Sequence, residues 1–216
     1  MEGRALVSPR TVRVGFRAGE GIMLQGEPAT GVYLVRRGLV KLTSISKQGR
    51  PALLALVGPG GVFGEQALLE SRGRRVGPRS TEGTPAATAL TDGELSVVPI
   101  AEVWGREDLS FFLEALAARL GDAITALERL LHHAAVARLA GVLADLAGRF
   151  GVPAGRGIEL PVMLAQHDLA GMVGSSRETV NRSLGAVRAM GWVDGAGGRL
   201  VVLDAPALRR FAEEGP

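Results

Sequence analysis

The chain has 216 residues, of which 46% are hydrophobic and 22% charged, with a formal net charge of +3. This composition is typical of a globular protein with one large or two modest domains, and it excludes a disordered chain or a polybasic tail. Cysteine is absent, which excludes disulfides, thiol redox sensing and cysteine-ligated iron–sulfur clusters. The sequence has no signal core and no membrane-spanning stretch, so we expect a cytoplasmic protein with no membrane partner.

Residues 11–100 have a pattern typical of β-structure. Short apolar runs alternate with glycine-containing breaks and occur at 11–14, 32–35, 39–43 and 53–57. Many short strands with regular glycine turns predict a sandwich or a jelly-roll β-barrel. Residues 71–86 are rich in Arg, Gly, Ser, Thr and Pro and predict a long exposed loop, after which 87–99 resumes the strand pattern.

From about Leu109 the apolar period becomes helical. Leucine and alanine recur at alternating steps of three and four residues, which is the heptad pattern of a coiled-coil seam. The seam residues are Leu113, Leu116, Leu120, Ala123, Leu127 and Leu130. One interpretation is a single amphipathic helix that packs on its own domain. We favour a dimer-forming helix, because the pattern lasts three heptads and the small Ala123 permits close approach of a partner.

The stretch 166–184 predicts two short helices that are broken at Gly174. Ala170 is small enough for a crossing helix, and Gly174 can take the positive φ that a tight turn requires. Ser175 or Ser176 then supplies an N-cap oxygen for the second helix. These features together, at this spacing, predict a helix-turn-helix.

The segments on either side extend this prediction. An amphipathic helix at 136–150 and a short strand at 158–162 precede the helix-turn-helix. A β-hairpin at 192–202 and a short helix at 206–214 follow it. A hairpin directly after the second helix of the motif makes a winged helix.

The second helix of the motif has an apolar face and a polar face. The apolar face carries Val180, Leu184 and Val187, and the polar face carries Arg177, Glu178, Asn181 and Arg182. A solvated face with ordinary i,i+4 pairing is the alternative interpretation. Because the polar array coincides with helix-turn-helix spacing, we interpret it as a surface that reads base edges in the major groove of double-stranded DNA.

A β-barrel, a long seam helix and a winged helix, in this order, resemble the cyclic-AMP receptor protein/FNR family of bacterial transcription regulators over nearly the whole chain. The resemblance includes Gly26, 38–42 and 60–65, and it is strongest in 176–182, which reads SRETVNR. It implies an α+β fold with three parts: a cyclic-nucleotide-binding-like jelly roll at 1–107, a dimerisation helix at 108–134 and a winged helix-turn-helix at 135–216. It also implies a homodimer on a pseudo-palindromic operator, with RNA polymerase as a further partner.

The same resemblance implies roles for individual residues. Arg177 and Glu178 would read base edges, Arg182 would add a base or phosphate contact, and Ser176 would touch phosphate. The chemistry agrees, because arginine suits guanine O6 and N7 and glutamate accepts from cytosine N4. Asn181 shares their face and completes the predicted DNA-binding set.

The resemblance also implies an effector pocket in the barrel, where Gly64 and Glu65 match the family's cyclic-AMP binders. The family's phosphate-binding arginine and hydroxyl positions fall on Gly83 and Thr84, so the guanidinium is missing. Arg79 and Ser80 have the required residue types but lie four residues early.

On the seam helix, the adenine-contacting positions fall on Ala123 and Ile124, which offer no polar hydrogens, with Thr125 beside them. A cyclic phosphate without its guanidinium partner loses a charge-assisted hydrogen bond. We therefore expect operator binding without cyclic AMP and name no certain cofactor. The alternative is a cyclic-AMP-dependent activator that uses Arg79 and Ser80 through a longer loop.

Two other functions are alternatives to a DNA-binding regulator. Cupin-type enzymes need a histidine and glutamate metal cluster inside the barrel. The histidines of this chain are His132, His133 and His167, all outside it. We therefore expect neither an enzyme nor a metal site. A sensor module that binds protein through its winged helix is the second alternative, and the cationic face of the second motif helix argues against it.

Overall fold

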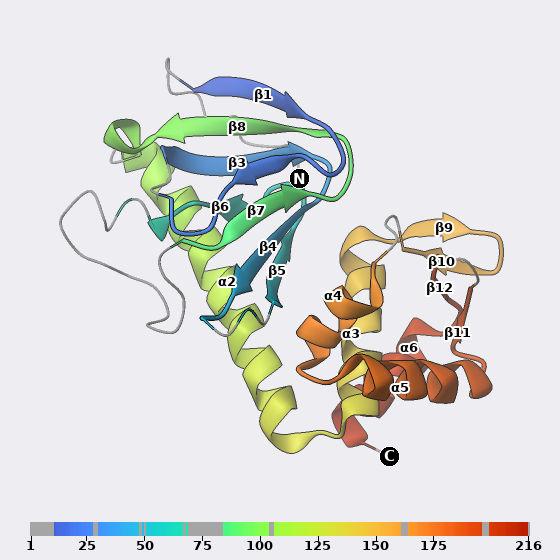
Figure 1. Cartoon of the computed structure of the whole chain (residues 1–216). Coiled ribbons are helices and arrows are strands. Elements are labelled where there is room, and N and C mark those ends of the chain that lie inside the picture. The colour runs from blue at the N-terminus through green and yellow to red at the C-terminus, as the bar shows by residue number, and fades with distance from the viewer. Residues whose placement is uncertain are drawn as a thin grey trace. The chain divides into compact units, whose positions relative to one another are not determined.

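The computed structural model describes residues 11–27, 30–47, 49, 51–66, 68, 84–103, 106–160, 164–195 and 199–215. The chain divides into two units, residues 1–121 and residues 122–216, each with its own core (Figure 1). Among the helices described, none has the length and apolar character needed to cross a membrane.

The first unit contains two four-stranded antiparallel sheets. One has the order β1-β8-β3-β6, built from Val12–Phe16, Gly93–Pro99, Gly31–Arg37 and Val62–Phe63. The other has the order β2-β7-β4-β5, built from Gly21–Met23, Ala86–Ala89, Val40–Ile45 and Pro51–Val57. Two facing antiparallel sheets of short strands confirm the jelly-roll prediction. Most of the predicted loop, including residues 71–83, lies outside the described residues.

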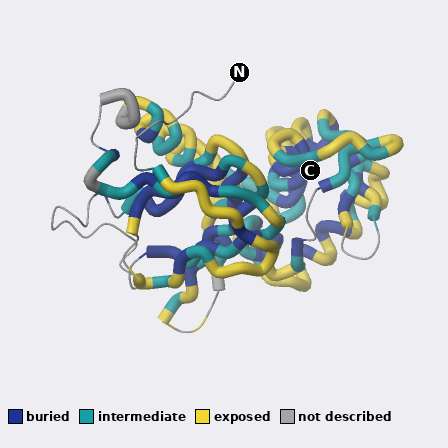
Figure 2. The backbone as a smooth tube through the Cα atoms, turned by 90° about the horizontal axis from the view of Figure 1, so that it is seen from above, coloured by how far each residue is buried: buried dark blue, intermediate teal, exposed yellow. Residues whose placement is uncertain are grey.

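The centre of the first sheet, at β3, is buried on both of its faces. Between the two sheets lies a cluster that includes Tyr33 and Val35 of β3 together with Val40 and Leu42 of β4. On the opposite face, residues from β3, β6 and β8 pack with Phe112 of the following helix. β3 is therefore apolar from Gly31 to Val35, because neither of its faces meets water there. Figure 2 shows such buried stretches of the chain in dark blue.

A short 3₁₀ turn, η1 (Ile100–Glu102), leads into the long helix α2 (Arg106–His132). Near its beginning, Phe112 and Ala115 pack on the outer face of the first sheet. Further along, every residue from Leu120 to Glu128 is exposed. The boundary between the two units falls within this helix, after Gly121.

The second unit confirms the predicted winged helix-turn-helix. Its helices are α3 (Ala135–Phe150), α4 (Gln166–Val173), α5 (Arg177–Ala189) and α6 (Ala205–Glu214). A small sheet has the order β11-β12-β10-β9, from Val193–Asp194, Val201–Val202, Gly157–Glu159 and Val152–Ala154. The strand at β10 was predicted, although longer, whereas β9 was not. The hairpin of β11 and β12 is the predicted wing.

The core of the second unit forms around α3. This helix packs against both α5 and α6, and its buried positions are mostly alanine and leucine. Small side chains let neighbouring helices approach closely, which holds α5 by its apolar face. The other face of α5 is left for solvent.

Candidate nucleic-acid interface

The turn between α4 and α5 has the geometry that the sequence predicts. α4 ends at Gly174, whose φ of 62° and ψ of 47° lie in the left-handed region. The Gly174 N–H donates to the Gly171 carbonyl over 3.3 Å, and the Ser175 N–H donates to the Ala170 carbonyl over 3.0 Å. A Cβ at position 174 would also lie 2.9 Å from Cδ1 of Leu130. Both conformation and space therefore favour glycine here.

Ser176 caps α5. Its Oγ accepts a hydrogen bond from the Thr179 N–H over 3.1 Å and lies 2.9 Å from Thr179 Oγ1. Of the two candidate caps, Ser176 is therefore the one in use. Glu178 lies in the first turn, where a carboxylate favours the positive end of the helix dipole. Phosphate contact by Ser176 stays a prediction.

The outward face of α5 carries two arginines without a polar partner in the part of the chain that the structure describes. All five predicted DNA-binding positions are exposed, namely Ser176, Arg177, Glu178, Asn181 and Arg182. The guanidinium groups of Arg177 and Arg182 make no hydrogen bond or ion pair with any described residue. Arginines in this unit that donate to carboxylates or carbonyls are Arg129, Arg138, Arg149, Arg156, Arg188 and Arg199. The two free guanidiniums can contact base edges or phosphates without breaking an internal bond.

One hydrogen bond joins the start of α4 to the outward face of α5. Asn181 Nδ2 donates to Gln166 Oε1 over 3.1 Å, and both side chains are exposed. Gln166 was not among the residues predicted to bind DNA. The structure places it directly beside one that was.

Arg138 of α3 forms hydrogen bonds with the turn of the helix-turn-helix. Its Nε donates to the Val173 carbonyl over 2.7 Å, and its Nη2 donates to the Gly174 carbonyl over 3.3 Å. Its Nη1 donates to the His133 carbonyl, just beyond the end of α2, over 2.7 Å. These oxygens belong to helix ends, which attract a cation. Arg138 therefore ties the end of α2 to the turn that positions α5, a role that the sequence analysis missed.

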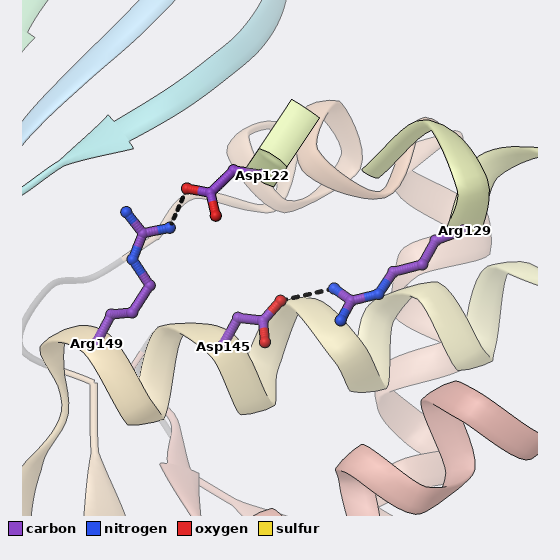
Figure 3. A network of polar contacts seen from close by, with 4 residues as sticks. All are labelled: Asp122, Arg129, Asp145 and Arg149. Carbon is purple, nitrogen blue, oxygen red and sulfur yellow. Dashed lines mark hydrogen bonds and ion pairs between the residues drawn. The ribbon is translucent and has the colours of Figure 1, made fainter. Parts of the chain in front are cut away.

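Two ion pairs join α2 to α3 (Figure 3). Arg129 Nη1 lies 2.6 Å from Asp145 Oδ2, and Arg149 Nη1 lies 2.8 Å from Asp122 Oδ2. On each helix the aspartate comes before the arginine in the sequence. Because the two helices run antiparallel, each arginine faces an aspartate. A Cβ at Gly141 would lie 2.9 Å from Arg129 Cζ, so this glycine gives the guanidinium room to cross α3.

The wing is tied to the end of α5. Arg188, in the last turn of α5, donates through Nη2 to the Gly195 carbonyl over 3.3 Å. Beside it, the Gly195 N–H and the Arg156 guanidinium both donate to Asp194, over 2.7 Å and 2.9 Å. The Gly195 N–H in particular, together with Arg156, lowers the pKa of the Asp194 carboxyl.

In the first unit, the predicted effector residues Gly64 and Glu65 lie beside β6. Gly64 has a φ of 80°, and a Cβ there would lie 2.7 Å from the Tyr33 ring, so glycine is required. Glu65 Oε1 pairs with Arg119 Nη1 of α2 over 2.8 Å. Glu65 Oε2 is buried and has no hydrogen-bond partner in the described part of the chain. Arg119, which the sequence did not indicate, therefore forms an ion pair with a predicted effector residue.

Of the other predicted effector residues, the structure describes Thr84 and Thr125, and neither forms a hydrogen bond with Glu65. Thr84 is buried, and its hydroxyl donates to the Glu27 carbonyl. Thr125 is exposed on α2 and makes no polar contact with any described residue. Arg79 and Ser80 lie outside the described residues. Within the described ranges, no group of three or more His, Asp or Glu side chains could hold a metal ion.

Comparison with known proteins gives two successive family matches. Residues 13–104 match the cyclic nucleotide-binding domain, and residues 137–211 match the Crp-like helix-turn-helix domain. The CRP-like cAMP-activated global transcriptional regulator of Mycobacterium tuberculosis is 32% identical over 92% of this chain and 87% of its own length. The transcriptional regulator SdrP of Thermus thermophilus is 34% identical over 93% of this chain and 94% of its own length.

Solved structures show the same relationship. A transcriptional regulator of the CRP/FNR family from Thermus thermophilus superposes with a TM-score of 0.79 and 30% identity, covering 94% of this chain and 98% of the other. A second regulator of the CRP family from the same organism gives a TM-score of 0.76 and 28% identity, covering 94% and 96%. Both domains of this chain therefore have counterparts, in the same order, within single regulators.

Proposed function

The chain belongs to the CRP/FNR family of transcription regulators, and on that premise we propose that it acts as a homodimer on a pseudo-palindromic operator. The observation that carries the proposal is the outward face of α5, where Arg177 and Arg182 have no internal partner among the described residues and flank Glu178. Two copies of α5 would enter successive major grooves, about one helical turn apart.

Individual base contacts follow from the chemistry of this face. Arg177 reads guanine through O6 and N7, and Glu178 accepts from cytosine N4. Arg182 contacts a base or a phosphate, and Ser176 lies at the helix start, where a phosphate would approach. These assignments are supported by the exposure of all four residues on one end and face of α5.

The dimer is supported by an exposed apolar stripe on α2. Leu113, Leu120 and Leu127 follow one another at steps of seven and are 56%, 63% and 54% exposed. Ile124 and Leu131 are also exposed and extend this stripe, whereas Leu116 of the predicted seam is only half-buried. A second copy of α2 fits it best, because leucines at heptad spacing pack against a like helix.

We further propose that operator binding does not require cyclic AMP. Thr84 already gives its hydroxyl proton to the Glu27 carbonyl, and Ala123 and Ile124 offer an adenine no hydrogen bond. Cyclic-AMP-dependent activation through Arg79 and Ser80 is the second candidate. It is favoured by the buried Glu65 Oε2, which has no partner among the described residues and could accept from a ribose hydroxyl. The Mycobacterium tuberculosis relative is named as cAMP-activated, which also favours this second candidate.

We propose that the chain has three functional parts: an effector domain at 1–107, a dimerisation helix at 108–134 and a DNA-binding domain at 135–216. RNA polymerase is the proposed partner on DNA, in the cytoplasm. The chain is a regulator and not an enzyme, as its relatives are transcriptional regulators.

Operator binding is tested by selecting duplexes from a random library with the full chain, then titrating the selected duplex and a scrambled one. We expect a two-fold related motif and specific binding that weakens steeply as salt rises, because phosphate contacts release counterions. Equal affinity for the two duplexes at every salt concentration would contradict the proposal.

A further inference from the structure

The hydrogen bond between Gln166 and Asn181 lies on the surface that would face DNA. Asn181 Nδ2 donates to Gln166 Oε1 over 3.1 Å, and neither side chain has another polar partner among the described residues. Both are exposed, so the bond replaces contacts with water and adds little to folding. What it does is fix the direction of an amide on the outward face of α5.

A fixed Asn181 amide retains a defined set of hydrogen-bonding groups. One Nδ2 hydrogen is used by Gln166, which leaves the second Nδ2 hydrogen and Oδ1 for DNA. An adjacent donor and acceptor match adenine, which presents the N7 acceptor and the N6 donor in the major groove. Guanine presents two acceptors, whereas cytosine presents a donor alone, so neither matches both groups.

Gln166 is suited to hold the other end of this link. It is the first residue of α4, the first helix of the motif, and in a helix-turn-helix that helix crosses the DNA backbone. Its Nε2 hydrogens are unused within the described chain, and glutamine amides and helix N-termini are common phosphate donors. The Gln166 amide can therefore donate to a phosphate through Nε2 while its Oε1 accepts from Asn181.

We propose that Gln166 is a positioning residue for base readout, which orients Asn181 toward an adenine in each half-site and anchors it to the DNA backbone. The inference depends on the proposed operator function of α5. It adds a specificity position that Arg177 and Glu178 do not supply.

The experiment selects duplexes from a random library with the wild type and with Asn181→Ala, Gln166→Ala and Gln166→Glu. The wild type should enrich adenine at one position of each half-site, by about tenfold or more over other bases. Asn181→Ala should lose this preference and keep those due to Arg177. Gln166→Ala should reduce it several-fold, and the double alanine variant should be no worse than Asn181→Ala alone.

Gln166→Glu separates positioning from anchoring. Its carboxylate still accepts from Asn181 but cannot donate to phosphate, so the adenine preference should persist while affinity for all duplexes falls. Gln25→Ala is the matched control, because it removes an exposed glutamine amide that bonds to Ile45 in the first unit. That control should leave the selected motif unchanged.

The outcomes are distinguishable. A wild-type motif that Asn181→Ala leaves intact overturns this inference alone. A Gln166→Ala variant that weakens all duplexes uniformly, with its adenine preference unchanged, also overturns it and leaves Gln166 as a phosphate contact. If the wild type selects no motif, the operator proposal fails and this inference fails with it.

Discussion

Arginines of the second unit differ in whether their guanidinium groups have hydrogen-bond partners within the unit. Arg138 donates to three main-chain carbonyls within the unit, and its guanidinium is committed to the fold. Arg177 and Arg182, on α5, have no such partners among the described residues. A guanidinium that has no partner in the unbound protein can contact DNA without breaking an internal bond.

Replacing Arg177 or Glu178 with alanine should lower specific operator affinity by about 1–3 kcal/mol and relax preference at one base pair per half-site, because we propose that each contacts a base edge. Titrations against the selected and the scrambled duplex measure this. An equal loss on both duplexes would instead identify phosphate contacts.

Arg138→Ala should destabilise the DNA-binding unit by about 1.5–3 kcal/mol, because helix-end carbonyls lose a charged donor. Thermal unfolding followed by circular dichroism measures the change. Arg210→Ala is the control, since Arg210 is exposed on α6 and has no polar partner among the described residues. Equal melting temperatures for the two variants would show that the carbonyls find other donors.

At the scale of elements, local patterns were sufficient to predict most helices and strands. Short apolar runs between glycines predicted β1, β3, β4 and β5 and one strand segment over β7 and β8, but not β2 or β6. The small residue, turn glycine and cap predicted α4 and α5. The strand β9 was missed because it is only three residues long, follows Gly151 at the end of α3, and contains Pro153, a residue that is unfavourable in strands. Arg138 and Arg119 were missed because their partners lie far along the chain, and a helical period says nothing of such contacts.

Leu120→Arg or Leu127→Arg should convert the protein to a monomer, because like charges would meet in a desolvated seam. Operator affinity should then collapse, since a single half-site supplies only part of the contacts. Sedimentation measures the oligomeric state. An unchanged dimer in both variants would remove α2 as the interface.

The two ion pairs between α2 and α3 predict a charge-reversal result. Arg129→Asp and Asp145→Arg should each lower the free energy of unfolding by roughly 0.2–1 kcal/mol, because the pair that they break is partly exposed. The double variant restores opposite charges and should recover most of the loss. Urea unfolding of the four proteins measures the coupling, which would be absent if the double variant were simply the sum of the singles.

At the scale of the whole molecule, the sequence predicted the order of domains and the family but not the state of the effector site. Gly64 and Glu65 were found by resemblance, whereas the pairing of Glu65 with Arg119 depends on how α2 packs on the sheet. The resemblance also placed the family's phosphate-binding positions on Gly83 and Thr84, but it did not predict the contacts that these residues make. The Thr84 hydroxyl is committed to the Glu27 carbonyl, which no local pattern indicates.

Added cyclic AMP should leave operator affinity unchanged, because a ligand that binds weakly has little differential free energy to shift a conformational equilibrium. Calorimetry with cyclic AMP, paired with operator titrations with and without it, tests this. Micromolar binding that Arg79→Ala abolishes, together with a large gain in operator affinity, would support the cyclic-AMP-dependent alternative instead.

The bonds of Arg138 have a consequence for which substitutions the chain can accumulate. Its acceptors are main-chain oxygens, and a main-chain oxygen is present whatever side chain the residue carries. A saturation library should therefore tolerate many residues at position 133 and almost none but arginine at position 138. The side chain that makes this connection is encoded at position 138 alone, so position 133 can vary without loss of the connection, whereas Gly174 is retained for its backbone conformation.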